Sequence, residues 1–172
     1  MSTDIEILVV VHPGSACGSA SFNIGNQDAR AARNSLVNEL DAWLGPLVVI
    51  DGDLSIELPD YPALSGALEN ALARARQAGH MSLRLTGDDP EQNGRIRKVI
   101  ESMGAEQKRA AFFNITGGWF YKGNGGGCVG GVYDVIVSMG CKANVCDSAL
   151  CYAEEDDEND EKDSEDVDAI KF

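Results

Sequence analysis

The feature that most constrains the fold is a regular alternation of short apolar runs with amphipathic segments of helical spacing. The apolar runs cover residues 5–11, 47–50, 81–85, 111–115 and 143–150. Runs of this length are typical of strands that are buried on both faces of a parallel sheet. Strands that alternate with single helices are joined by right-handed crossovers, which place helices on both faces of the sheet.

The segments between these runs carry helix start and stop signals. Residues 27–44 place their apolar side chains on one face, with Asn26 as the N-cap and Gly45-Pro46 as the stop. Asp60 and Gly79 bound a second helix, and Asp89-Pro90 opens a third, which ends before Gly104. Residues 128–139 form the last predicted helix.

The predicted fold is therefore a single three-layer α/β/α domain over residues 1–153, with a mostly parallel sheet of about five strands. Such a domain is Rossmann-like or flavodoxin-like, and the sequence leaves the strand order open. A chain of 172 residues with 44% apolar content is long enough for one such core.

Two observations indicate a soluble, cytoplasmic protein. The first apolar run is short and follows Asp4 and Glu6, so we expect neither a signal peptide nor a membrane span. The five cysteines are odd in number and contain no C-x-x-C pair. This pattern argues against a disulfide framework, and the spacing of Cys141, Cys146 and Cys151 is too wide for a usual zinc site.

The acidic residues are concentrated at one end of the chain. Of the net charge of −14, residues 154–172 contribute −9, from eleven acids against two lysines. A like-charged run with so little apolar content is expected to form a disordered acidic tail. Because this tail would repel phosphate backbones, we do not expect direct binding to nucleic acid.

The end of this tail, Ile170-Lys171-Phe172, follows the acidic run directly. It is similar to the acidic tip of bacterial single-stranded DNA-binding proteins, which have proline where Lys171 stands. The resemblance implies docking onto a partner enzyme through the terminal aromatic residue and the acids. The alternative is a tail that only keeps the protein soluble.

Two segments that follow predicted strands have the composition of a binding site. Residues 12–25 form an unusually long connection, rich in small and hydroxylated residues, and residues 117–131 contain eight of the 19 glycines. Both lie where α/β sheets bind ligands, outside the carboxyl ends of the strands. The predicted ligand-binding residues are Ser15, Gly18, Ser19, Thr116, Gly117, Trp119, Gly126 and Gly127.

Cys128 is the candidate nucleophile. It stands where three glycines give way to a helix, and the positive end of a helix dipole favours the thiolate. His12 is the candidate base and Asp51 the acid that would orient it, with Asp53 as an alternative acid. The alternative for Cys128 is a small apolar side chain packed under the helix.

A resemblance points the same way. Ile115-Thr116-Gly117, Cys128-Val129, Asp134, Gly140 and Asp147-Ser148-Ala149 together resemble the C-terminal half of the isochorismatase-like cysteine hydrolases. The resemblance implies a hydrolase with Cys128 as nucleophile. It covers about a fifth of the chain, and the family's aspartate and lysine partners are not matched: His12 stands at the first position, and no lysine closely follows Leu85.

We predict no bound cofactor, with magnesium as the one ion left open. Asp51-Gly52-Asp53 and Asp88-Asp89 have the carboxylates that magnesium prefers. Asp89, however, serves as a helix cap, and Asp51-Gly52 is typical of a turn.

The leading hypothesis is a small cytoplasmic enzyme, a hydrolase or transferase, that acts on a small polar or anionic ligand in the glycine-rich crevice. The alternative is a non-enzymatic adaptor of phage or plasmid type, which would engage a DNA-processing partner through residues 154–172.

Overall fold

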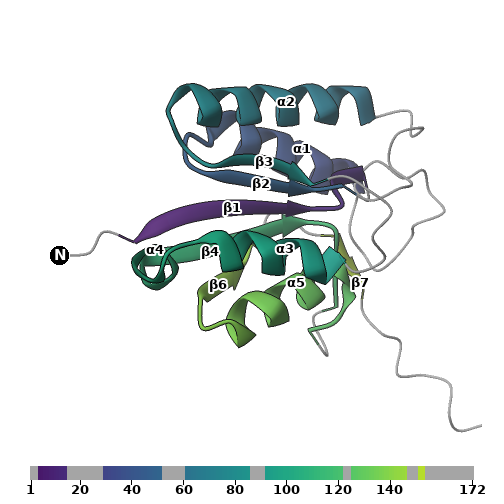
Figure 1. Ribbon diagram of the computed structural model, residues 1–172. Helices are drawn as coiled ribbons and strands as arrows, with labels where there is room; N and C mark the ends of the chain where they lie inside the picture. Colours follow the sequence, from purple (N-terminus) through teal and green to yellow (C-terminus); the bar gives the residue numbers. More distant parts are fainter. Residues whose placement is uncertain are drawn as a thin grey trace, which may run out of the picture.

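A 5-stranded parallel sheet forms the centre of the protein (Figure 1). The computed structural model describes residues 4–14, 29–51, 61–85, 92–121, 125–146 and 151–153. The strands of this sheet are β1 (Ile5–Val11), β2 (Leu47–Ile50), β3 (Ser82–Leu85), β4 (Ala111–Gly117) and β6 (Lys142–Val145).

The strand order is β3-β2-β1-β4-β6, so β1 lies in the middle of the sheet. The chain first builds the sheet in one direction, from β1 to β3, and then returns to the other side of β1 with β4. This is the order of the first five strands of a Rossmann sheet, whereas a flavodoxin-like sheet places its second strand at the edge. The predicted three-layer α/β fold is confirmed, and the order selects its Rossmann-like form.

Two helices cover each face of the sheet (Figure 1). Helices α1 (Ala29–Ala42) and α2 (Tyr61–Gln77) pack on one face, and α3 (Gln92–Ser102) and α5 (Gly127–Ser138) pack on the other. Successive side chains of β1 alternate between the two layers. Leu8 and Val10 join the core under α1 and α2, and Val9 and Val11 join the core under α3 and α5.

Three short elements were not predicted. Helix α4 (Ala105–Ala110) has no buried residue, and the Gln107 side chain caps it by accepting a hydrogen bond from the Gly104 N–H at 2.9 Å. Strands β5 (Trp119–Tyr121) and β7 (Cys151–Ala153) pair with each other in a second, 2-stranded parallel sheet.

Of the predicted strands, the last one differs most in its bounds. The apolar run over 143–150 predicted a single strand, but β6 ends at Val145, and Cys146 follows outside the strand. The Cys146 N–H still donates to the Ile115 carbonyl at 2.8 Å. Residues 147–150 and the predicted acidic tail, residues 154–172, lie outside the described residues. Within the described part of the chain, no helix is both long and apolar enough to cross a membrane.

Candidate functional site

The candidate site lies at the carboxyl ends of β1 and β4, where the strand order reverses. These strands are neighbours, and Val11 at the end of β1 pairs with Gly117 at the end of β4. In open α/β sheets the connections leave this point toward opposite faces, and a ligand-binding crevice opens between them. We therefore expect a crevice at the ends of β1 and β4, beside Val11 and Gly117, and use the word crevice for this place.

The backbone of β4 approaches β1 too closely for side chains at its end. A Cβ atom placed at Gly117 would lie 2.5 Å from the Val11 carbonyl oxygen, and Gly117 itself has φ 107°. A Cβ atom at Gly118 would lie 2.9 Å from the same oxygen and 2.5 Å from the Sγ atom of Cys128. These two glycines let the thiol of Cys128 lie directly against the ends of both strands.

His12 reaches the same place through an uncommon backbone conformation. Among the described residues it is the only non-glycine with positive φ, at 45°. Its N–H donates to the Ile50 carbonyl at 2.8 Å, which fixes the turn against β2. The Cβ of His12 lies 3.5 Å from the Cβ position of Gly118, so His12 and Cys128 flank one point of the crevice. Such backbone strain often accompanies functional sites.

Cys128 is held in the first turn of α5. The preceding residue, Gly127, begins the helix, and Gly126 is the N-cap, which has no side chain to bond the first N–H groups. The carbonyl of Gly125 packs onto the helix so closely that a Cβ at Gly130 would lie 1.8 Å from its oxygen. Backbone N–H groups at an uncapped helix start are suited to binding an anion or an oxyanion.

Thr116 lies beside this crevice but on the other face of the sheet. Its neighbour Ile115 belongs to the core under α3 and α5, so the Thr116 side chain points toward the α1 layer. It is fully buried, and its Oγ1 atom has no hydrogen-bond partner in the described structure. Such an atom is rare in native proteins, because leaving a buried hydroxyl unpaired is costly.

Asp51, the predicted orienting acid, takes part in an ion pair. Arg84 binds its carboxylate through Nε at 2.6 Å and through a second guanidinium nitrogen at 3.3 Å. Arg84 also pairs with Glu69 of α2, so this ion-pair group lies on the α2 side of the sheet. Cys128 packs against the core on the opposite side. This placement gives no support to a role for Asp51 in orienting His12.

Other predicted residues are partly or wholly outside the described structure. Trp119 begins β5, directly after Gly118. Ser15, Gly18, Ser19 and the acids of the magnesium alternative, Asp53, Asp88 and Asp89, lie outside the described residues. In the described ranges, no group of three or more histidine, cysteine or acidic side chains is arranged to hold a metal ion.

The structure reveals a half-buried acid, Glu39, that the sequence analysis did not single out. Glu39 of α1 accepts a hydrogen bond from the Cys146 thiol, and its second carboxylate oxygen is buried without a partner among the described residues. Burial raises the pKa of Glu39 above its ordinary value of 4.5, and the bond from Cys146 opposes this shift. A single glutamate on an otherwise amphipathic helix carries no sequence signal of such burial.

Comparisons of the chain with known protein families, with curated proteins and with solved structures found no match.

Proposed function

We propose that the protein is a cytoplasmic, cysteine-dependent hydrolase or transferase that acts on a small polar or anionic ligand in the crevice between β1 and β4. One observation carries the proposal. The Sγ of Cys128 and the Cβ of His12 lie 2.5 Å and 3.5 Å from the position that a Cβ atom on Gly118 would occupy. A thiol and an imidazole at one crevice are the two groups that cysteine-dependent acyl transfer requires.

The chemistry follows from the roles that these groups can take. His12 accepts the thiol proton, and the Sγ of Cys128 attacks the carbonyl carbon of the ligand. The N–H groups at the start of α5 stabilise the oxyanion that forms. When the carbon–oxygen or carbon–nitrogen bond breaks, the leaving group takes the proton from His12, and an acyl thioester remains on Cys128. Water or a second ligand then releases the acyl group.

The glycines support this assignment because they leave the main chain uncovered. Gly126 and Gly127 at the start of α5 carry no side chains that could cover the N–H groups of the first turn. A polar or anionic ligand can therefore approach the N–H groups directly.

Acyl trapping tests the proposal without knowledge of the natural ligand. The full chain is incubated with p-nitrophenyl acetate, and intact-protein and peptide mass spectrometry locate any acetyl group. We expect one acetyl group on Cys128, with a burst of p-nitrophenolate. Cys128→Ala should abolish both, whereas the matched control Cys141→Ala, which removes a buried thiol, should retain both. Acetylation that is absent, or that persists in Cys128→Ala, would contradict the proposal.

A further inference from the structure

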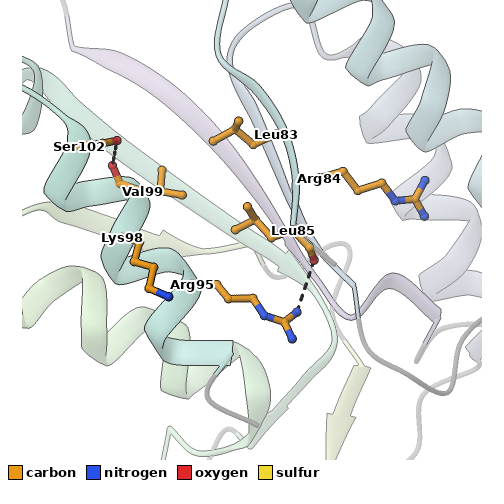
Figure 2. A pocket seen from close by; sticks show the side chains of 7 residues that line it. All are labelled: Leu83, Arg84, Leu85, Arg95, Lys98, Val99 and Ser102. Carbon is orange, nitrogen blue, oxygen red and sulfur yellow. Dashed lines mark hydrogen bonds between the residues drawn. The ribbon is translucent and has the colours of Figure 1, made fainter. Parts of the chain in front are cut away.

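A second site lies at the opposite edge of the fold, between the edge strand β3 and helix α3. The groove there has a volume of about 490 Å³ (Figure 2). We call it the β3–α3 groove, and it is lined by Leu83, Arg84, Leu85, Arg95, Lys98, Val99 and Ser102. It is separate from the crevice at β1 and β4, because β2 lies between β3 and β1.

The groove combines an apolar floor with a cationic wall (Figure 2). Leu83 and Leu85 extend from β3, and Val99 faces them from α3. Arg95 and Lys98 extend from the same helix, and Arg95 donates to the Leu85 carbonyl at 3.5 Å. Among the described residues that line the groove none is acidic, although the whole chain has a net charge of −14.

Arg84 does not add to the charge of this wall. In Figure 2 its side chain points away from the other lining residues, and its guanidinium is held by Asp51 and Glu69. The other two cationic residues that line the groove, Arg95 and Lys98, both belong to α3.

The main chain of β3 is suited to accept another strand. Among the described strands, β3 pairs with β2 alone. The carbonyls of Met81 and Leu85 accept bonds from Leu47 and Asp51, so the N–H and C=O groups of Ser82 and Arg84 point away from β2. An outward row of such groups beside an apolar groove is the usual template for the addition of an extended peptide.

We propose that the β3–α3 groove binds the acidic segment 154–172 of the same chain, as an extended strand beside β3. Two complementary properties select this occupant. Its charge of −9 is opposite to that of the α3 wall, and it ends in the alternating pattern Asp168-x-Ile170-x-Phe172. In an extended strand these three side chains share one face, as Leu83 and Leu85 do on β3.

The positions of the charges set the expected direction of the added strand. Arg95 lies at the Leu85 end of the groove, and Ser102 lies toward the Leu83 end (Figure 2). A strand antiparallel to β3 would place Asp168 toward Arg95, with Ile170 and Phe172 along the leucines. A parallel strand would put Asp168 at the end that lacks the cations.

The segment is long enough to reach. The segment follows β7, which pairs with β5 just after the end of β4, and the whole main sheet from β6 to β3 is roughly 20 Å wide at ordinary strand spacing. The fifteen residues 154–168 span up to roughly 50 Å when extended. The proposal is independent of any activity at Cys128.

A binding experiment tests the occupant. A fluorescein-labelled peptide of residues 154–172 is titrated into the full chain carrying Ile170→Ser and Phe172→Ser, so that its own segment competes weakly. We expect saturable binding that Lys98→Glu weakens about tenfold. Arg76→Glu, which reverses an exposed charge on α2, should change the affinity less than about twofold. Absence of saturable binding, or equal weakening by both reversals, would overturn the proposal.

Hydrogen exchange tests whether the segment 154–172 binds beside β3, and whether it comes from the same chain or from a second copy. In the full-length protein, the amides of Ser82 and Arg84 should exchange about tenfold more slowly than in the Ile170→Ser, Phe172→Ser variant, at every protein concentration. Equal rates would overturn strand addition at β3. Protection that is lost on dilution would assign the groove to a second copy and overturn the proposal for the same chain.

Discussion

A cysteine lies near each end of helix α5, and the two thiols are in opposite situations. Cys128 lies in the first turn, half-buried at the crevice beside His12. Cys141 follows the helix end and is 6% exposed within the core. Burial raises the pKa of the Cys141 thiol, and the charge of Lys108 only partly opposes this. Position relative to the sheet edge therefore separates a thiol suited to chemistry from one suited to packing.

The largest effect is expected from damage to the start of α5. Gly130→Ala would place a methyl group 1.8 Å from the carbonyl oxygen of Gly125, and neither backbone can easily move. We expect a loss of about 3 kcal/mol in the free energy of unfolding, measured by urea denaturation. Gly66→Ala is the matched control, because a Cβ there meets nothing within 4 Å in a helix. A Gly130→Ala protein as stable as that control would contradict the close packing.

Serine substitutions of Cys141 and Cys128 should lower the free energy of unfolding by different amounts. Cys141→Ser buries a hydroxyl in an apolar core, and we expect it to cost about 2 kcal/mol in urea unfolding. Cys128→Ser should cost less than about 1 kcal/mol, because Cys128 is only partly buried and lies at the crevice. Equal losses in the free energy of unfolding would contradict the difference in packing between Cys141 and Cys128.

The histidines allow a matched test of the proposed base. His12→Ala should slow alkylation of Cys128 near neutral pH about tenfold, because the thiol loses its proton acceptor. His80→Ala removes the other histidine, which is exposed after α2, and should leave the rate unchanged. The rates are followed by peptide mass spectrometry. Equal rates in wild type and His12→Ala would remove His12 from the mechanism.

The smallest effect concerns Glu39, away from both cysteines of α5. Because burial raises its pKa in the folded state, the folded protein loses stability as pH rises from the ordinary value of 4.5 through the raised pKa. Glu39→Gln removes this loss and can still accept the Cys146 bond. The variant should match wild type at about pH 4 and become the more stable protein by about pH 8.

Urea unfolding at both pH values measures the difference, and Glu101→Gln on the exposed face of α3 is the control. If the difference in unfolding free energy between Glu39→Gln and wild type is the same at both pH values, burial does not raise the pKa of Glu39.

The fold was predictable where burial leaves a strong pattern. The apolar runs of β1 and β2 and the helical spacing of apolar residues between the runs identified the layers, because strands buried on both faces tolerate little else. The strand order was not predictable, since it depends on which crossover packs on which face. Helix α4 and strands β5 and β7 were missed because elements of three to six residues are too short to leave a periodicity in the sequence.

The proximity of the candidate residues was only partly predictable from the sequence. His12 and Cys128 could be grouped because parallel strands end at one edge. Asp51 follows its strand in the same way, but its side chain is directed to the α2 layer, where Arg84 binds it. This contact depends on the register of β2 with β3, which cannot be read from the sequence pattern. The positive φ of His12 also had no signal, because glycine is the usual residue for it.

Competitive alkylation of the native full chain tests the central claim most directly. With limiting iodoacetamide near neutral pH, peptide mass spectrometry gives a rate for each thiol. We predict that Cys128 reacts at least about tenfold faster than Cys141 and also faster than Cys146. A Cys128 rate equal to or below that of Cys141 would mean that the start of α5 holds a packed cysteine and not a nucleophile.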